Sequence, residues 1–306
     1  MSDNTKNVLV TGATGFIGQS LCRELLARGD SVVVLTRSHN KANKLFGSQV
    51  SIVTNLDEIE SDKKIDAVVS LTGAPVVGGL WTKKRKQLLI DSRLNDLKAI
   101  NTLCERLETK PSVLVNASAI GYYGIRGHEE VTENDKGQDI FQSILCQKRE
   151  DLGFSFEKFG TRVCNVRIGL VFANDGGAYP QMTRPIKFGL GAIFGDGQQY
   201  MSWIYKADMI RVILFLLDND SLSGAINATA PEAVTNEMFT KKVAAHYKRP
   251  VFFKAPAFVL KTLLGELSQL FLEGQRVIPE KLLQAGFQFE QNTFDNMLSV
   301  IDSNEN

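Results

Sequence analysis

The sequence predicts an α/β protein built on a doubly wound parallel sheet, with a smaller, mainly helical C-terminal lobe. This prediction rests on the hydrophobic pattern and on the length of the chain. Short apolar stretches alternate with helix-length amphipathic segments from residue 8 to residue 172. Because crossovers between such strands are right-handed, this alternation predicts a parallel sheet. The chain has 306 residues, slightly more than one core usually holds. We therefore expect a sheet domain at 1–172 and a second lobe at 173–306, some segments of which return to the sheet domain.

The first strand, expected at residues 8–11, runs into a glycine-rich turn that opens a helix. Gly12 permits the tight exit from the strand, Gly15 lets the backbone approach a pyrophosphate, and Gly18 lets helix and strand pack closely. The free N–H groups at the start of the helix would face the phosphates. A second apolar strand at 31–36 completes the βαβ unit. This context on both sides of the glycines predicts a Rossmann-type dinucleotide site.

The carboxylate that an NAD site usually has at the end of the second strand is missing. It normally lies about 20 residues beyond the glycines and binds the ribose 2′-hydroxyl, but no Asp or Glu occurs between Ser31 and Leu56. Thr36, Arg37 and Ser38 stand in its place, and Arg37 can make a forked contact with a 2′-phosphate. The alternative is that Arg37 is a solvated loop cation. The sequence therefore predicts NADP(H).

Four more strands are expected, at 50–53, 66–71, 113–117 and 163–168, with helices at 82–107 and 140–159. Ligands of an open α/β sheet bind outside the carboxyl ends of its strands, so the loops that begin at Thr72 and Ser118 should lie at the cofactor edge. Beyond residue 171 the sequence has glycine-rich loops suited to shaping a pocket. A helix after Pro256 is apolar on nearly all sides, and we expect it to be packed in the second lobe.

The bulk properties exclude several classes of protein. A net charge of +1 does not suggest a nucleic-acid or anionic-membrane partner. The N-terminus has no apolar run, so neither a signal peptide nor a bilayer-spanning segment is expected. The three histidines are dispersed, and we expect no metal site. The four cysteines form no CxxC pair and are typical of reduced thiols in a cytoplasmic protein: Cys22, Cys104, Cys146 and Cys164.

Several motifs resemble one known family, the extended short-chain dehydrogenase/reductases of the epimerase and dehydratase branch. They are the glycine turn at 11–18, Leu71-Thr-Gly-Ala74, Tyr122-Tyr-Gly124 and Trp203-Ile-Tyr-Lys-Ala-Asp208. Residues 118–124, 185–191 and 273–279 resemble more narrowly an atypical subgroup of this family. Its members are called epimerase-family proteins, and some carry a cell-division-inhibitor label. The resemblance covers nearly the whole chain.

The resemblance implies a set of NADP-binding positions. By the subgroup's pattern Thr36 and Arg37 hold the adenosine phosphate, Arg93 reaches the cofactor from the long helix, and Val171 lines the nicotinamide end. Arg93 can also be an ordinary helix-surface arginine. With the motifs above, the expected cofactor site comprises Gly12, Thr14, Gly15, Phe16, Ile17, Gly18, Thr36, Arg37, Ser38, Leu71, Thr72, Gly73, Arg93, Ser118 and Val171.

The acid–base pair of the parent family is absent. That family places a Tyr and a Lys four residues apart on one helical face, where the Lys lowers the pKa of the Tyr. None of the six tyrosines is followed by a Lys at this spacing. The corresponding helix has Gln142 and Cys146 in the two positions. The candidate catalytic groups are therefore Tyr122, Ser118 and Cys146. The alternatives are aromatic packing for Tyr122 and an inert buried thiol for Cys146.

Two functions follow from these observations. One is an NADP-dependent oxidoreductase or epimerase with an altered mechanism, acting on a small polar, sugar-like substrate. The other is a non-catalytic protein that uses NADP(H) occupancy to regulate a partner, in cell division if the label of some subgroup members applies. The intact cofactor motif favours the first function, and the missing Tyr–Lys pair favours the second.

Overall fold

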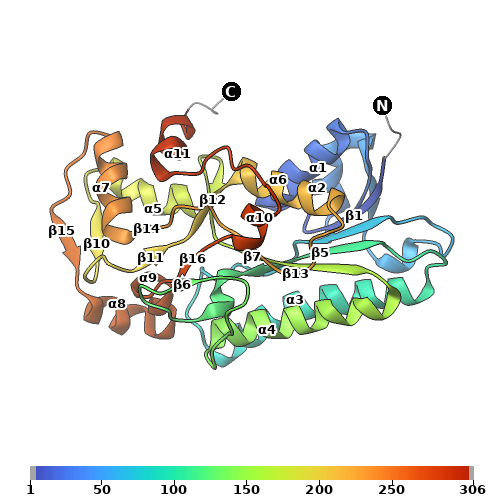
Figure 1. Ribbon diagram of the computed structural model, residues 1–306, viewed down its shortest axis with the longest axis horizontal. Coiled ribbons are helices and arrows are strands. Elements are labelled where there is room, and N and C mark those ends of the chain that lie inside the picture. The colour runs from blue at the N-terminus through green and yellow to red at the C-terminus, as the bar shows by residue number, and fades with distance from the viewer. Residues whose placement is uncertain (1–4, 303–306) are drawn as a thin grey trace.

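Seven parallel strands form the central sheet, in the order β13-β7-β5-β4-β1-β2-β3. The structure, a computed structural model, describes residues 5–302 and confirms the expected doubly wound α/β fold (Figure 1). β1 lies between β2 and β4, so the strand order reverses there, and Val8 pairs with both Val32 and Ala67. The strands of this sheet are β1 (Asn7–Thr11), β2 (Ser31–Leu35), β3 (Ser51–Val53), β4 (Ala67–Ser70), β5 (Val113–Ala119), β7 (Arg162–Ile168) and β13 (Gly224–Ala228).

Alternate residues of the strands face opposite sides of the sheet, because successive side chains of a strand point in opposite directions. Val8 and Val10 join the core under one helical layer, whereas Leu9 joins the core under the other. The first layer holds α1 (Phe16–Ala27), α2 (His39–Phe46) and α6 (Lys206–Asp218), and the second holds α3 (Lys83–Arg106) and α4 (Phe141–Phe154). Figure 1 shows the two layers above and below the sheet.

The second lobe has its own aromatic core. Phe172 stacks on Trp203 with ring centroids 5.9 Å apart, and both side chains are fully buried. The helices of this part are α5 (Ala178–Lys187), α7 (Asn236–His246), α8 (Ala257–Leu264), α9 (Gln269–Leu272), α10 (Glu280–Gln284) and α11 (Phe294–Val300). Its short strands are β8 (Leu170–Ala173), β9 (Gly176–Gly177), β10 (Ala192–Phe194), β11 (Tyr200–Met201), β12 (Trp203–Tyr205), β14 (Val234–Thr235), β15 (Phe253–Ala255) and β16 (Arg276–Val277), of which β16 pairs with β6 (Glu130–Val131).

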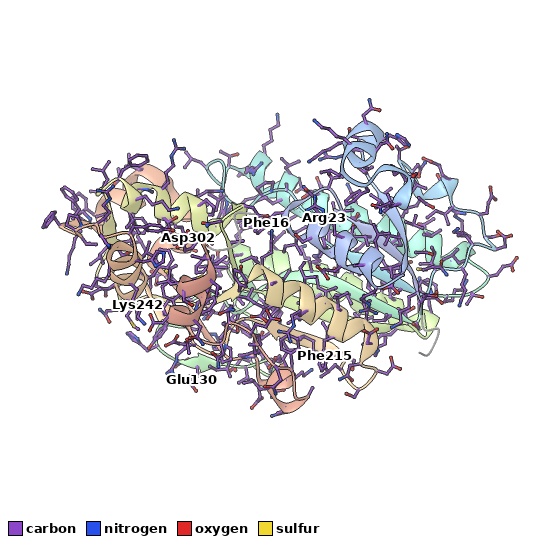
Figure 2. The ribbon with its side chains drawn as sticks, turned by 90° about the horizontal axis from the view of Figure 1, so that it is seen from above. Phe16, Arg23, Glu130, Phe215, Lys242 and Asp302 are labelled. Carbon is purple, nitrogen blue, oxygen red and sulfur yellow. The ribbon has the colours of Figure 1, made fainter. Side chains whose placement is uncertain are left out.

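The chain returns from the second lobe to the central sheet. β13 comes from beyond residue 172 yet completes one edge of the central sheet beside β7. Viewed from above, Arg23 of α1 lies over the sheet, Lys242 and Asp302 lie in the second lobe, and Phe16 lies between them (Figure 2). The described residues contain no helix long and apolar enough to cross a membrane.

One expected element differs from the structure. The segment after Pro256 does form a helix, but α8 has no buried residue, and Phe258 and Leu263 are 72% and 67% exposed. The expected packing is found only at the end of the segment, where Leu264 and the buried Leu267 join a cluster with Trp81 and Leu89. Apolar residues on every side of a helix indicate burial only if other elements are available to cover them, and α8 lies at the outer end of the lobe (Figure 1).

Candidate functional site

The glycine turn between β1 and α1 leaves no room for a side chain at Gly12 or Gly18. Gly12 has a φ of +71°, and a Cβ there would lie 2.8 Å from the carbonyl carbon of Leu71 at the end of β4. A Cβ on Gly18 would lie 2.4 Å from the carbonyl oxygen of Gly12. The turn therefore holds β1, α1 and the loop after β4 closer together than any other residue would allow. This cradle fits the pyrophosphate of a dinucleotide.

The start of α1 is open to an anion. Gly15 stands at the N-cap, and no side chain accepts a hydrogen bond from the first turn. The backbone N–H of Gly15 donates to the carbonyl of Gly12 at 2.9 Å, which closes the turn. The first N–H groups of a helix have no partner within the helix. Here they are available to phosphate oxygens at the positive end of the helix dipole.

The end of β2 carries the residues expected to select the cofactor. Thr36 is buried, and its hydroxyl oxygen accepts from the N–H of Ser38 at 3.2 Å. The side chain of Ser38 caps α2 by accepting from the N–H of Lys41. Arg37 is exposed and makes no ion pair within residues 5–302. A free guanidinium at a helix start can receive a phosphate without breaking an existing contact.

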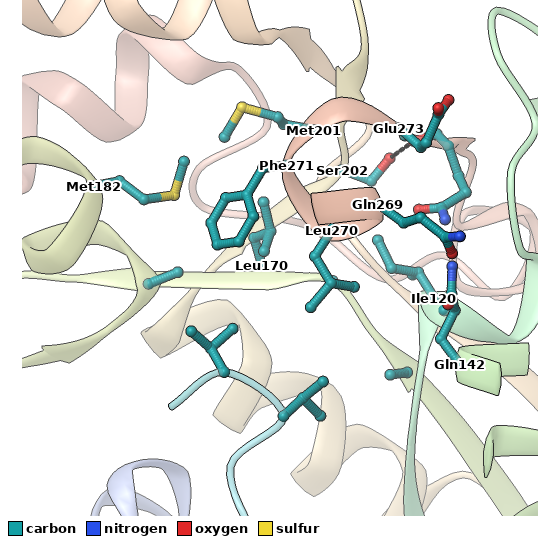
Figure 3. A pocket seen from close by; sticks show the side chains of 18 of the residues that line it. Ile120, Gln142, Leu170, Met182, Met201, Ser202, Gln269, Leu270, Phe271 and Glu273 are labelled. Atoms are coloured by element: carbon teal, nitrogen blue, oxygen red, sulfur yellow. Dashed lines mark hydrogen bonds between the residues drawn. The ribbon is translucent and has the colours of Figure 1, made fainter. Parts of the chain in front are cut away.

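A cavity of about 850 Å³ opens beyond the carboxyl ends of β4 and β5. One wall comes from the sheet domain, and includes Leu71, Thr72, Gly73, Arg93, Ser118 and Cys146 of the residues singled out in the sequence. The opposite wall comes from the second lobe. Figure 3 shows Met182, Leu170 and Phe271 on one side and the amides of Gln142 and Gln269 on the other. The volume is in the range of roughly 300–1,000 Å³ typical of small-molecule sites.

Two guanidinium groups line the sheet side of this cavity. Arg93 donates to the carbonyls of Leu89 and Ala74 at 2.9 and 3.1 Å. Arg149 is 3% exposed and donates to the carbonyl of Thr72 at 2.6 Å. Within the described part of the chain neither group lies within 4.0 Å of a carboxylate. Burial lowers the pKa of both, to about 10 for Arg149, so both are cations at neutral pH. Unpaired buried cations beside a cofactor cradle are typical of anion binding.

Arg149 also belongs to a buried polar network that fixes the strand ends. Its guanidinium donates to the Ser70 hydroxyl at 2.9 Å and to the Asn116 side-chain oxygen at 2.9 Å. The Asp96 carboxylate accepts from the hydroxyls of Thr11 and Ser70, each at 2.7 Å. The network ties β1, β4, β5, α3 and α4 together. The sequence analysis did not find it, since each member comes from a different element.

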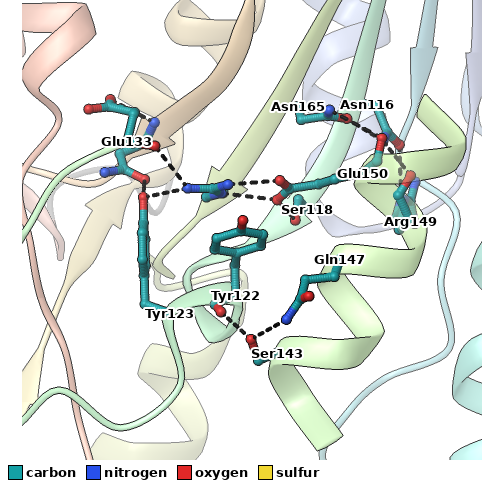
Figure 4. A network of polar contacts seen from close by, with 12 residues as sticks. Asn116, Ser118, Tyr122, Tyr123, Glu133, Ser143, Gln147, Arg149, Glu150 and Asn165 are labelled. Atoms are coloured by element: carbon teal, nitrogen blue, oxygen red, sulfur yellow. Dashed lines mark hydrogen bonds and ion pairs between the residues drawn. The ribbon is translucent and has the colours of Figure 1, made fainter. Parts of the chain in front are cut away.

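Ser118 stands at the head of a second network, drawn in Figure 4. Its hydroxyl donates to the Glu150 carboxylate at 2.6 Å. Glu150 accepts two bonds from Arg167, at 3.0 and 2.9 Å. Arg167 donates onward to the hydroxyl of Tyr123 at 2.9 Å, and that hydroxyl donates to Asn227 at 2.6 Å. Ser118 is therefore the end of the chain of polar groups that faces the cavity.

The other two candidate catalytic residues occupy different surroundings. Tyr122 is not among the residues that line the cavity, and its ring lies 3.4 Å from the Arg167 guanidinium. Cys146 does line the cavity, but burial, followed by the charge of Glu150, raises the pKa of its thiol to about 11. The thiol is therefore neutral at pH 7, and the lowered pKa that a nucleophile needs is not present.

Two further residues of the expected cofactor site, Val171 and Phe16, do not line the cavity. Val171 of β8 packs with the main core, whereas its neighbour Leu170 lines the cavity, because adjacent residues of a strand face opposite ways. Phe16 lies under β9, where a Cβ on Gly177 would lie 2.6 Å from its ring. In residues 5–302, no group of three or more His, Cys, Asp or Glu side chains could hold a metal ion.

Comparison with protein families gives two matches. The model of the NAD dependent epimerase/dehydratase family matches residues 8–228, and a domain of unknown function matches residues 255–301. An epimerase family protein of Staphylococcus aureus strain N315 is 35% identical over 286 residues, 93% of this chain and 95% of that protein. One from Mycobacterium leprae is 36% identical over 294 residues, 95% of this chain and 94% of that protein.

Two solved structures resemble this one over 97% of its length. The human epimerase family protein SDR39U1, crystallised with NADPH, has a TM-score of 0.84, is 28% identical and is covered over 99% of its chain. A nucleoside-diphosphate sugar epimerase from Corynebacterium glutamicum has a TM-score of 0.77, is 25% identical and is covered over 58% of its chain. These proteins are similar to this chain in the sheet domain and in the second lobe.

Proposed function

This chain belongs to the NAD dependent epimerase/dehydratase family, and from that premise we propose that it is an NADP(H)-dependent oxidoreductase. Nucleotide-cofactor binding follows from the family and from the glycine cradle. The preference for NADP(H) is part of the proposal. Its supports are the absent carboxylate after β2, the free Arg37, and the NADPH of the similar human protein. The four free cysteines agree with the reducing cytosol that we expect as its location.

The observation that supports a catalytic role is the cavity, which continues from the cofactor edge into the second lobe. A protein that only sensed NADP(H) would not need the cavity to extend beyond the cofactor residues Leu71, Thr72 and Ser118 to the second-lobe residues Met182 and Phe239. When bound, NADPH would supply a hydride to a carbonyl carbon, and a proton from solvent would complete the alcohol. The chain must therefore hold a carbonyl and stabilise the charge that develops on its oxygen.

Ser118 is the group best suited to meet that oxygen. It lies in the cavity wall, and Glu150 holds its hydroxyl through a 2.6 Å hydrogen bond. A serine hydroxyl has one proton, which Glu150 accepts here, so the hydroxyl would rotate away from Glu150 to donate to a developing alkoxide. Arg93 supplies positive charge on the same wall, near enough to lower the pKa of the Cys146 thiol against the effect of burial.

One observation supports a second function, that of a regulatory protein. Gln142 and Cys146 replace the Tyr and Lys of the parent family; the amide of Gln142 does not titrate, and burial keeps the Cys146 thiol from acting as a base at neutral pH. This replacement supports a regulatory protein that binds NADP(H) without turning it over. The two functions differ in one measurable property, the fate of bound NADPH.

The test is the absorbance of NADPH mixed with the purified protein and a panel of carbonyl compounds. We expect oxidation that depends on protein and substrate, and we expect Ser118→Ala to lower kcat, measured at saturating NADPH, by about 10²–10³. Tyr122→Phe is the matched hydroxyl deletion, and it should retain kcat since its ring does not line the cavity. Tight NADPH binding without oxidation by any carbonyl would favour the regulatory function.

A further inference from the structure

We propose that the second-lobe half of the cavity takes an uncharged, mainly apolar carbonyl compound, in place of the small polar, sugar-like substrate that the sequence suggests. This inference rests on the proposed function, because it names the substrate class for the same site. It follows from the composition of the cavity wall, the distribution of charge along it, and the side chains at its mouth.

The wall contributed by the second lobe carries many apolar side chains, beside uncharged polar ones from Gln181, Gln199, Tyr200, Ser202, Asn236, Thr240, Gln269 and Gln275. Met182 and Ile186 of α5, Phe239 of α7, and Leu170, Phe194 and Met201 of the short strands all line it. Phe271 adds another ring from α9, and Figure 3 shows it near Met182 and Leu170. Methionine and aromatic side chains make close dispersion contacts with apolar ligands of irregular shape. A sugar hydroxyl placed against one of these apolar side chains would lose its hydrogen bonds to water without replacement, at a cost for each buried group.

The charges along the cavity exclude a nucleoside diphosphate in this half. The charged residues that line it are Arg93, Arg149 and Glu273. Both arginines lie on the sheet side, where they contact the loop after β4 that the cofactor approaches. The second-lobe side has no lysine or arginine in its lining, and its one charge is the carboxylate of Glu273. A diphosphate buried there would have no cation to balance it and would be repelled by Glu273.

The mouth of the cavity is also apolar. Val77, Leu190 and Leu270 each line the cavity and yet are 46%, 64% and 36% exposed. They come from the loop after β4, the turn after α5, and α9. Single exposed apolar residues are common on protein surfaces, whereas a group of them at a pocket entrance is typical of a binding site. An apolar ligand passing this entrance removes these side chains from water.

Uncharged polar groups line both sides of the cavity. Ser118 and Gln142 lie on the sheet wall next to the cofactor edge, and Figure 3 shows the amides of Gln142 and Gln269 away from Met182. The second lobe adds further amides and hydroxyls, among them Gln181 and Thr240. A ligand whose carbonyl lies toward Ser118 places its body against the apolar side chains of Met182 and Phe239, and the polar groups along the wall would fix its orientation.

The first experiment uses Nile red, an uncharged fluorescent probe, with protein saturated by NADPH. We expect the probe to bind, and decanal or benzophenone to displace it while UDP-glucose does not. Leu190→Lys should weaken probe binding by about tenfold, because the bound probe would no longer bury a leucine side chain at the cavity mouth. Leu263→Lys is the matched control, since Leu263 is 67% exposed but does not line the cavity. The control should bind the probe within about twofold of the parent.

The second experiment follows NADPH oxidation with the same compounds and with a UDP-4-keto sugar. Oxidation by the apolar carbonyls, weakened in Leu190→Lys and not in Leu263→Lys, supports both the proposed function and the substrate class. Oxidation by the UDP-4-keto sugar alone keeps the proposed function and overturns the substrate class. Probe binding and displacement with no oxidation by any compound overturns the proposed function and keeps the apolar ligand. Failure of the probe to bind, or equal weakening by both lysine variants, also overturns the substrate class.

Discussion

Arg167 and Glu150 form a two-pronged ion pair behind Ser118, with nitrogen–oxygen distances of 3.0 and 2.9 Å. Their side chains are only 4% and 3% exposed. Burial by itself would lower the pKa of Arg167, but the hydrogen bonds and charge of Glu150 raise it above its usual value. The Arg167 guanidinium therefore stays charged in the interior and holds the Glu150 side chain that accepts from Ser118.

Removing one partner of this pair should destabilise the fold strongly. Glu150→Gln leaves Arg167 buried without a counter-charge, and we expect the free energy of unfolding to fall by about 3–5 kcal/mol. Urea denaturation measures it. Glu105→Gln removes an exposed pair with Lys158 and should cost at most about 1 kcal/mol. Similar losses in the two variants would show that Glu150 and Arg167 are not held as the structure describes.

The glycine cradle predicts a loss of cofactor binding when it is filled. Gly12→Ala adds a methyl group 2.8 Å from the Leu71 backbone at a φ of +71°, so we expect the Kd of NADPH to rise at least about tenfold. Gly47→Ala is the control, because Gly47 also has a positive φ, +58°, but nothing within 4 Å. It should lose about 1 kcal/mol of stability and keep its NADPH affinity. Isothermal titration and thermal unfolding separate the two effects.

The selection of NADP(H) over NAD(H) should depend on Arg37. Arg37→Ala removes a charge-assisted contact with the 2′-phosphate, and we expect NADPH to bind about 10–100-fold more weakly while the Kd of NADH is unchanged. Arg23→Ala deletes an exposed cation from α1 and controls for net charge. Equal binding of NADH and NADPH by the unaltered protein would reject NADP(H) as the preferred cofactor.

The cysteines predict a stability that falls at alkaline pH. Burial raises the pKa of Cys22 to about 12 and that of Cys104 and Cys146 to about 11, against 9.0 for an unperturbed thiol. Above pH 9 the unfolded chain loses thiol protons that the folded chain keeps, so the unfolded state gains stability as the pH rises toward 11. We expect a decreasing urea midpoint over this window. At pH 8 iodoacetamide should label the four thiols only in the unfolded protein, and rapid labelling of Cys146 in the folded protein would contradict its burial.

The local features of the sequence predicted the sheet domain and the cofactor cradle. Alternating apolar strands, the glycine turn and the cap at Thr235 depend on neighbouring residues, so they can be read without knowing what packs on them. The helix expected at 140–159 appears as α4 and a 3₁₀ turn at Ser155–Phe159. Ends of helices are less predictable because caps and packing decide the last turn.

The cavity could not be predicted in the same way. Trp81 and Phe141 meet edge to face at 5.0 Å across 60 residues of chain, and Ser118 reaches Glu150 only because β5 and α4 are packed together. Arg149 gave no local signal of its burial, since an arginine on a helix is usually at the surface. Residues distant in the chain acquire a common role only through the packing that brings them together.

The sequence by itself determined that this chain binds a dinucleotide at the carboxyl end of a parallel sheet, because glycines at fixed spacing between a strand and a helix permit little else. It also determined that the usual Tyr–Lys pair is absent. Only the tertiary structure decided that Tyr122 packs on Arg167 away from the cavity lining, and that Cys146 is a neutral, buried thiol. Exposure and pKa are properties of surroundings, and here those surroundings come from elements far apart in the chain.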